Sequence, residues 1–88
     1  MQNSGLQSNS LRFKCLKTLL LKGSNVNHGN LRTKWLPLHW AAYYGDVKSV
    51  KLLLSFNAFV IYPEYEGQLP IDLAGKQKHV KVVEVLII

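Results

Sequence analysis

The chain has few of the features that mark secreted domains or membrane proteins. Its 88 residues include one cysteine, Cys15, so an internal disulfide is excluded, whereas a secreted domain of this size usually carries several cysteines. Apolar runs such as residues 85–88 are far too short to span a bilayer, and residues 1–10 do not have the pattern of a signal peptide. We therefore expect an intracellular protein, in the cytoplasm or the nucleus.

Acidic residues are also scarce, with five Asp and Glu against eleven Lys and Arg, which gives a net charge of +6. A positive balance of this size favours acidic partners or nucleic acid but is silent about the fold. The apolar fraction of 48% is that of an ordinary globular protein, and the length allows one small domain. Such a domain buries only roughly 60 to 65% of its unfolded surface, so the core must be economical.

Patterns that mark catalytic and metal sites are missing from the sequence. The histidines His28, His39 and His79 have no Cys, Asp or Glu beside them at the spacing of zinc ligands. The sequence has no nucleophile elbow, no phosphate-binding glycine loop and no paired carboxylates. We expect no enzyme activity, no cofactor and no metal.

An amphipathic helix recurs along the chain. Four apolar positions with helical spacing repeat at offsets of 34 and then 33 residues: Phe13, Leu16, Leu19 and Leu20; Val47, Val50, Leu53 and Leu54; Val80, Val83, Leu86 and Ile87. Before the second and third copies, LPLH from residue 36 and LPID from residue 69 place a proline in the first turn of a shorter helix. The repetition predicts a stack of similar helical units.

The ends of these elements are also visible in the sequence. Residues 1–10 are mostly Ser, Asn, Gln and Gly and are expected to be a disordered tail, with Asn9 or Ser10 capping the first helix and Gly23 ending it. Gly45 is expected to stop the next helix, and Asp46 to cap the one after it. The connectors 23–35 and 57–68 are expected to be hairpin-like loops.

These residues resemble the ankyrin repeat. LPLHWAAYYGDVKSVKLLLSFNA, residues 36–58, is similar to the family's Thr-Pro-Leu-His opening, Ala-Ala pair, Gly, second helix ending in Leu-Leu, and Gly-Ala. GQLPIDLAGKQKHVKVVEVLI, residues 67–87, matches in part, and LRFKCLKTLLLKGSNVN, residues 11–27, matches only from the second helix on. The resemblance implies an all-α solenoid of stacked antiparallel helix pairs, over residues 11–88.

Within that span we expect a partial repeat at 11–35 without its first helix, a full repeat at 36–68 and a truncated repeat at 69–88. This organisation indicates a fragment or short form of a longer array, because repeat arrays gain stability from neighbouring units. Both ends of the stack are expected to expose apolar surface and to promote self-association.

The sequence departs from the family pattern at several positions. Leu36 and Leu69 replace the threonine whose hydroxyl caps the first helix, and each lost cap costs about 1 kcal/mol. Asp72 replaces the family's histidine, whereas His39 keeps it and is expected to be a structural side chain bonded to nearby backbone. Lys34 replaces a glycine at a left-handed position, where a lysine is poorly tolerated.

The resemblance also implies a protein-protein interaction module, because the family contacts its partners mainly through loop tips and the exposed end of the first helix. These positions are Arg32, Thr33, Trp35, Tyr43, Tyr44, Phe56, Tyr65, Glu66, Gln68, Lys76 and Gln77. The aromatic residues among them are the best anchors for another protein, of unknown identity, although their rings could instead pack on neighbouring repeats. Trp40 is expected to point elsewhere around its helix and to pack.

Lysines recur on the polar side of the repeated helix, where stacking would align them in a stripe: Lys14, Lys17, Lys48, Lys51 and Lys81. A solvated helix face is the usual meaning of such a pattern. The alternative is an electrostatic adaptor that binds nucleic acid or an anionic membrane through the stripe.

Overall fold

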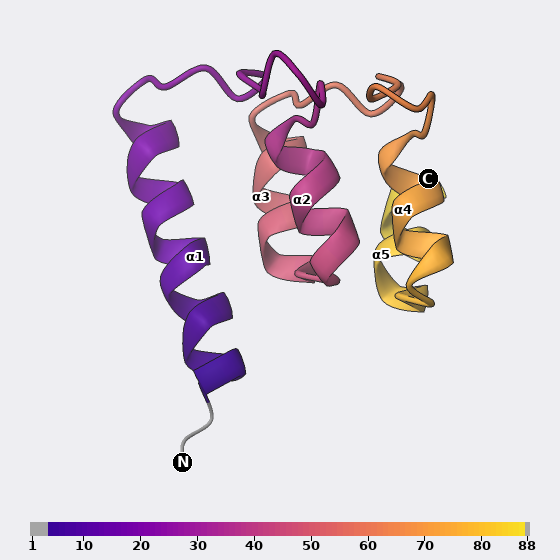
Figure 1. The fold of residues 1–88 in the computed structure, drawn as a ribbon. Helices are drawn as coiled ribbons and strands as arrows, with labels where there is room; N and C mark the ends of the chain where they lie inside the picture. Colours follow the sequence, from indigo (N-terminus) through magenta and orange to yellow (C-terminus); the bar gives the residue numbers. More distant parts are fainter. Residues whose placement is uncertain (1–3, 88) are drawn as a thin grey trace.

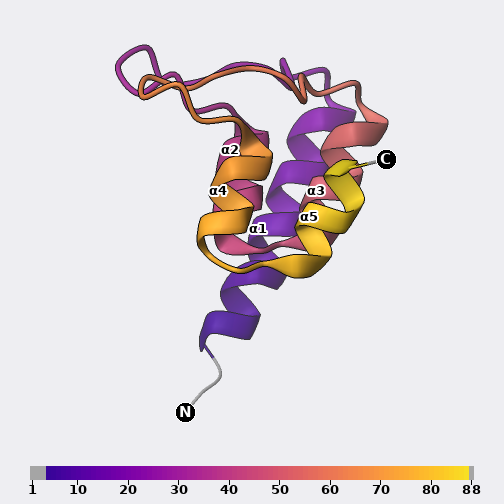
Figure 2. The ribbon, with the colours of Figure 1, turned by 90° about the vertical axis from the view of Figure 1, so that its right-hand side faces the viewer.

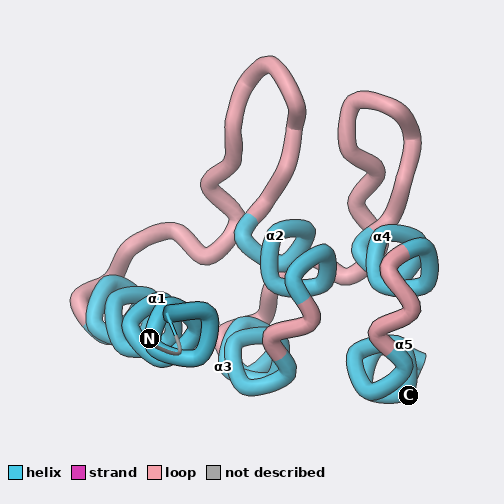
Figure 3. The backbone as a smooth tube through the Cα atoms, turned by 60° about the horizontal axis from the view of Figure 1, so that its bottom comes forward, coloured by secondary structure: helices cyan, strands magenta, loops and turns pink. Residues whose placement is uncertain are grey.

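A computed structural model describes residues 4–87 and contains five helices in that range, with no strand among them. They are α1 (Ser4–Leu21), α2 (Pro37–Tyr44), α3 (Val47–Ser55), α4 (Pro70–Lys76) and α5 (Val80–Ile87). Helices α2 and α3 form one antiparallel pair and α4 and α5 the next, with α1 standing alone beside α3 (Figure 1). The longer connections loop out from one side of the stack (Figure 3). The all-α solenoid expected from the sequence is confirmed.

The helices lie in two layers. Helices α1, α3 and α5 form one row, and α2 and α4 form a second row beside it (Figure 3). The core between the rows is built from small and aliphatic side chains: Leu20, Leu38, Ala41, Ala42, Val50, Leu53, Ala58, Ala74, Val82 and Leu86. Ala42 and Ala74 are fully buried, and their small side chains allow α2 and α4 to pack closely.

The first helix starts earlier than the sequence indicated. Helix α1 begins at Ser4, so residues 4–10 are helical, and the expected tail over residues 1–10 is corrected for them; residues 1–3 lie outside the described part of the chain. Residues 4–10 contain no proline, so nothing in the backbone chemistry stops the helical hydrogen bonds from extending back. The other end is as expected, because Gly23 adopts the left-handed conformation (φ 93°) just after the helix.

The two short helices begin at their prolines, and α2 ends at Gly45, as the sequence predicts. Pro37 and Pro70 are the first residues of α2 and α4. Gly45 follows α2 with φ 71°, and the Asp46 carboxylate accepts hydrogen bonds from the Ser49 backbone N–H (3.2 Å) and the Ser49 hydroxyl (2.7 Å). Asp46 therefore caps α3 directly after the turn.

Leu36 and Leu69 cannot cap α2 and α4 as a threonine would, but a side chain three residues further on makes one hydrogen bond at each helix start. The Leu36 N–H donates to Nδ1 of His39 (2.9 Å), and the Leu69 N–H donates to Oδ2 of Asp72 (2.9 Å). Each bond satisfies one of the backbone N–H groups that a helix start leaves without a partner. At the helix start, Asp72 thus accepts the same backbone N–H bond as the histidine that it replaces.

The loops between the helix pairs are hairpin-like, as expected, and project sideways past α2 and α4 (Figure 2). The first loop is closed by a bond from the Asn30 N–H to the Trp35 carbonyl (3.2 Å), and the second by one from the Glu64 N–H to the Gln68 carbonyl (2.9 Å). Lys34 has a φ of 60°, so a lysine does occupy the expected left-handed position. The loops project at an angle from the α2–α4 row (Figure 2), and we call the surface within this angle the recessed face.

Candidate protein-binding face

Four aromatic rings cluster on α2 and on Trp35, two residues before it. The rings of Trp35 and Trp40 lie 4.4 Å apart between centroids at 50°, and Trp35 meets Tyr43 edge-on at 5.6 Å. Trp40 stacks on Tyr44 at 6.0 Å, and Tyr44 meets Tyr43 edge-on at 5.1 Å. We call these four residues the aromatic cluster. Its outer members, Trp40 and Tyr44, are 44% and 47% exposed, whereas Trp35 and Tyr43 are half-buried.

A buried carboxylate holds Trp35 in place. Glu64, in the second loop, accepts a hydrogen bond from the Trp35 indole N–H at Oε2 (2.9 Å) and from the Gln68 N–H at Oε1 (3.0 Å), and Oε1 also accepts from the Glu66 N–H. Burial alone would raise the pKa of Glu64, but these three hydrogen bonds and the nearby His39 together lower it below its usual range. Glu64 is therefore ionised at neutral pH and ties the second loop to Trp35, two residues before α2.

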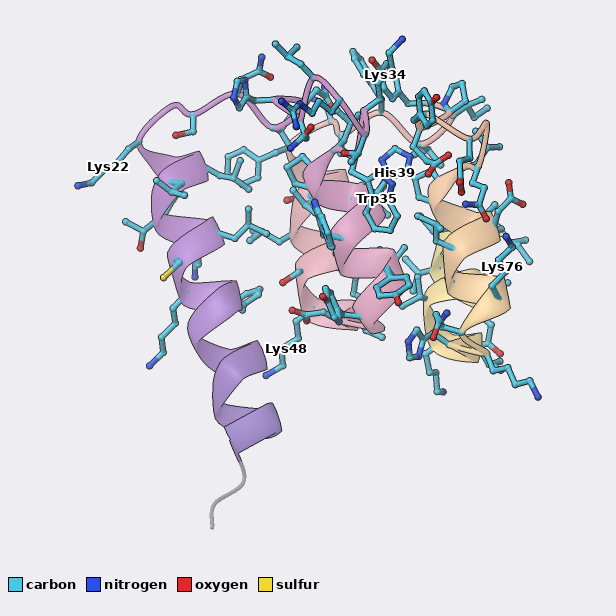
Figure 4. All side chains as sticks on the ribbon, viewed as in Figure 1. Lys22, Lys34, Trp35, His39, Lys48 and Lys76 are labelled. Carbon is cyan, nitrogen blue, oxygen red and sulfur yellow. The ribbon has the colours of Figure 1, made fainter. Side chains whose placement is uncertain are left out.

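His39 is the structural histidine expected from the resemblance. Nδ1 accepts from the Leu36 N–H, and Nε2 lies 2.9 Å from the Tyr62 carbonyl oxygen, which can only accept. These partners assign the neutral ring with its proton on Nε2. Burial lowers the pKa of His39, against the raising effect of its bonded carbonyl groups and of Glu64. Figure 4 shows His39 beside Trp35 at the loop end of α2.

A cavity of about 340 Å³ lies between the two loops and the aromatic cluster. Trp35 and Trp40 line it from the helix side, Arg32 and Thr33 from the first loop, and Glu64, Tyr65 and Glu66 from the second. The loops are held in register because the Tyr65 N–H donates to the Thr33 carbonyl (2.7 Å). Tyr65 is 75% exposed at the rim.

The structure brings some of the expected site residues together and separates others. Arg32, Trp35 and Tyr65 line the cavity, and Tyr43 and Tyr44 continue the same surface along α2. Trp40 was expected to point elsewhere, and this was wrong: it lines the cavity and joins the aromatic cluster. Trp40 precedes Tyr43 by three positions and Tyr44 by four, so helical geometry places all three on one face of α2, and the expectation overlooked this spacing.

Three other expected residues have different surroundings. Phe56, which follows α3, packs against the hydrophobic core. Gln68 is half-buried, and its side-chain amide donates to Oε1 of Glu66 (3.3 Å), so it supports the loop. Lys76 is exposed on the outer side of α4 (Figure 4). Glu64 was not singled out from the sequence, because its partner Trp35 lies 29 residues away and no periodic pattern connects them.

The five lysines predicted to align in a stripe lie on α1, α3 and α5: Lys14, Lys17, Lys48, Lys51 and Lys81. All five are exposed. Exposure is also what the solvated face of any surface helix shows, and no other observation favours a nucleic-acid or membrane surface. Cys15, in the same row, is exposed and unpaired.

Two further cavities lie away from the aromatic cluster and are mainly aliphatic. One of about 760 Å³ lies between α3, α5 and the second loop, with Leu54, Ile61 and Val85 in its lining. Another of about 400 Å³ lies between α1 and the start of α2. The larger one has Lys51 as its one charged lining residue and lacks the converging polar groups that orient a ligand, so we do not place the binding site there.

Within residues 4–87, no group of three or more His, Cys, Asp or Glu side chains is placed to hold a metal ion. None of the described helices is both long enough and apolar enough to cross a membrane.

Comparison with known proteins agrees with this architecture. A family model described as ankyrin repeats, in three copies, matches residues 7–88. Human ankyrin repeat and SOCS box protein 3 is 31% identical over 86 residues, covering 94% of this chain but 16% of its own length. A tyrosine-protein kinase of Hydra vulgaris is 46% identical over 75 residues, covering 78% of this chain and 9% of its own. Human inversin is 34% identical over 67 residues, covering 74% of this chain and 6% of its own length. The chain thus spans less than a fifth of these relatives.

Proposed function

Because the chain belongs to the ankyrin-repeat family, whose repeats act as non-enzymatic protein-interaction modules, we propose that its recessed face binds a segment of another protein. The observation that carries this proposal is the exposure of large aromatic rings beside a cavity: Trp40, Tyr44 and Tyr65. Aromatic side chains dominate interface energetics because they bury much area at a low cost in conformational entropy. The single exposed Cys15 supports a reducing, intracellular setting for this activity.

The rings are held in place before any partner arrives. Trp35 is fixed by Glu64, and Trp40 and Tyr43 each contact Trp35. A surface that is already ordered loses less conformational entropy on binding, so more of the contact energy appears as affinity.

A selection experiment tests the proposal. Peptides selected from a random phage-displayed library on the immobilised full chain are then measured in solution against the wild type and Trp40→Ala. We expect Trp40→Ala to weaken binding by about 2 kcal/mol, roughly 30-fold, as the loss of an interface anchor does. Lys48→Ala, an exposed change on α3, is the matched control and should bind as the wild type does.

Circular dichroism of both variants checks that the helices remain. Selected peptides whose affinity is the same for the wild type and for folded Trp40→Ala would place the binding surface elsewhere and remove the proposal.

A further inference from the structure

The cavity beside the aromatic cluster is acidic in an otherwise basic protein. Glu64 and Glu66 both line it, and they are two of only five acidic residues in a chain with a net charge of +6. Arg32 is the one basic residue in the lining. The walls therefore carry two negative charges and one positive, and the local field attracts a cation although the whole chain repels one.

The remaining walls of the cavity are mostly aromatic. Trp35 and Trp40 form an angled pair of indoles, 4.4 Å apart at 50°, and Tyr65 lines the cavity from the second loop. The faces of such rings attract cations, and tryptophan does so most strongly. The volume of about 340 Å³ is at the small end for ligand sites, which suits one side chain better than a large metabolite.

The two carboxylates have different roles toward a ligand. Both oxygens of Glu64 already accept hydrogen bonds from Trp35, Gln68 and Glu66, so Glu64 supplies charge but little hydrogen-bonding capacity. Glu66 is exposed at the rim and accepts one long bond, from the Gln68 amide (3.3 Å). A ligand that fits must present a flat, weakly hydrated cation to the indoles while it still donates to Glu66.

The group with these properties is the guanidinium of arginine, which is planar, always charged, stacks on aromatic rings and donates in a fork to carboxylates. We infer that the cavity binds an arginine side chain presented by the protein partner. This inference rests on the proposed function and names the chemistry that the face recognises. A lysine ammonium is more strongly hydrated and has no flat face to lay on the indoles, so it fits less well.

Arg32 distinguishes a cationic from an anionic ligand, because its own guanidinium lines the cavity. If the ligand is a cation, Arg32 opposes it, and Arg32→Gln should leave affinity unchanged or raise it. If the ligand is an anion, Arg32 is the group that would hold it, and Arg32→Gln should weaken binding.

Fluorescence provides a direct measurement, since Trp35 and Trp40 are the two tryptophans of the chain and both line the cavity. The full chain is titrated with acetyl-Gly-Gly-Arg-Gly-Gly-amide and with the same peptide carrying citrulline, which has the shape of arginine without the charge. We expect saturable binding with a Kd on the order of 1 mM for one side chain, and about 5- to 30-fold weaker binding of the citrulline peptide.

Variants then assign the groups. Glu66→Gln should weaken the arginine peptide about 3- to 10-fold, while Glu84→Gln, the same change at an exposed position on α5, should not alter it. Equal affinity for arginine and citrulline overturns the inference, as does no saturable signal at about ten times the expected Kd. Tighter binding of a lysine or trimethyl-lysine peptide, or weaker binding after Arg32→Gln, overturns it as well. Library peptides that need Trp40 but contain no arginine would remove this inference and leave the proposed function standing.

Discussion

Replacing Glu64 by glutamine tests how the binding face is held together. The two oxygens of Glu64 receive three N–H donors, from Trp35 at one oxygen and from Gln68 and Glu66 at the other. A glutamine has one oxygen and one NH₂ group, so its amide must point the NH₂ at a donor in either orientation. The better orientation keeps the oxygen toward the two backbone N–H groups and leaves the Trp35 indole N–H facing another donor.

The size of the effect follows from that geometry. A buried donor left without an acceptor costs about 1 to 3 kcal/mol. In a domain of this size each kcal/mol shifts Tm by roughly 4 to 8 °C, so we expect Glu64→Gln to lower Tm by about 4 to 24 °C. Thermal and urea unfolding followed by circular dichroism measures the loss. Glu66→Gln, an exposed change two residues away, should stay within about 0.5 kcal/mol of the wild type.

A double-mutant cycle separates the Trp35 bond from the rest. Trp35→Phe keeps an aromatic ring but removes the indole donor, so in its background Glu64→Gln no longer leaves that N–H unpaired. We expect the two changes together to be less destabilising than their sum by about 1 to 3 kcal/mol. Additive effects, or a Glu64→Gln variant within about 0.5 kcal/mol of the wild type, would refute the reasoning.

Three other predictions follow from features described above. Burial lowers the pKa of His39, so as pH falls the unfolded chain takes up a proton at this histidine before the folded chain does. The contribution of His39 to stability should therefore be full above pH 6.5 and should be lost as pH drops toward the lowered pKa. Melts at stepped pH should show a loss of at most about 1.4 kcal/mol per pH unit. Gly45→Ala should destabilise the fold more than Gly67→Ala does, although both glycines have positive φ. A Cβ at position 45 would lie 2.5 Å from Nδ1 of His79, whereas a Cβ at position 67 would point into open space. Equal losses in urea melts would show that the His79 contact is irrelevant. The exposed aliphatic side chains of α1 and α5 should make the isolated chain self-associate, so sedimentation equilibrium and melts should depend on concentration, and a monomer with a melt independent of concentration would contradict this.

The sequence predicted the parts of this fold that are periodic or local. Pro37, Gly45 and Asp46 act within one turn of the backbone, so their effect on helix ends depends on little beyond their neighbours. The start of α1 was misplaced because a polar, proline-free segment is compatible with both helix and coil, and composition alone does not decide between them.

The candidate site was harder to predict because it depends on contacts between repeats. Glu64 and Trp35 are distant in sequence. An acidic residue in a loop gives no sign that it will be buried and will accept a hydrogen bond from an indole. Trp40 was misplaced for a different reason: Tyr43 and Tyr44 are its i+3 and i+4 neighbours on α2, so the spacing already put it on their face. Only its contact with Trp35, which enters from the loop, lies outside what a helical wheel can show.

The bonds between the two loops have a consequence for how the recognition surface can change. The Tyr65 N–H bonds to the Thr33 carbonyl, and the Phe59 N–H bonds to the Asn27 side chain at 2.9 Å. Apart from Asn27, these contacts use main-chain atoms, which every non-proline residue carries. The side chains of Arg32 and Tyr65 at the loop tips can therefore be substituted while the bonds between the two loops remain. Single substitutions there can change the binding specificity. A library randomised at the loop tips, with Asn27 retained, would sample new specificities on an unchanged fold.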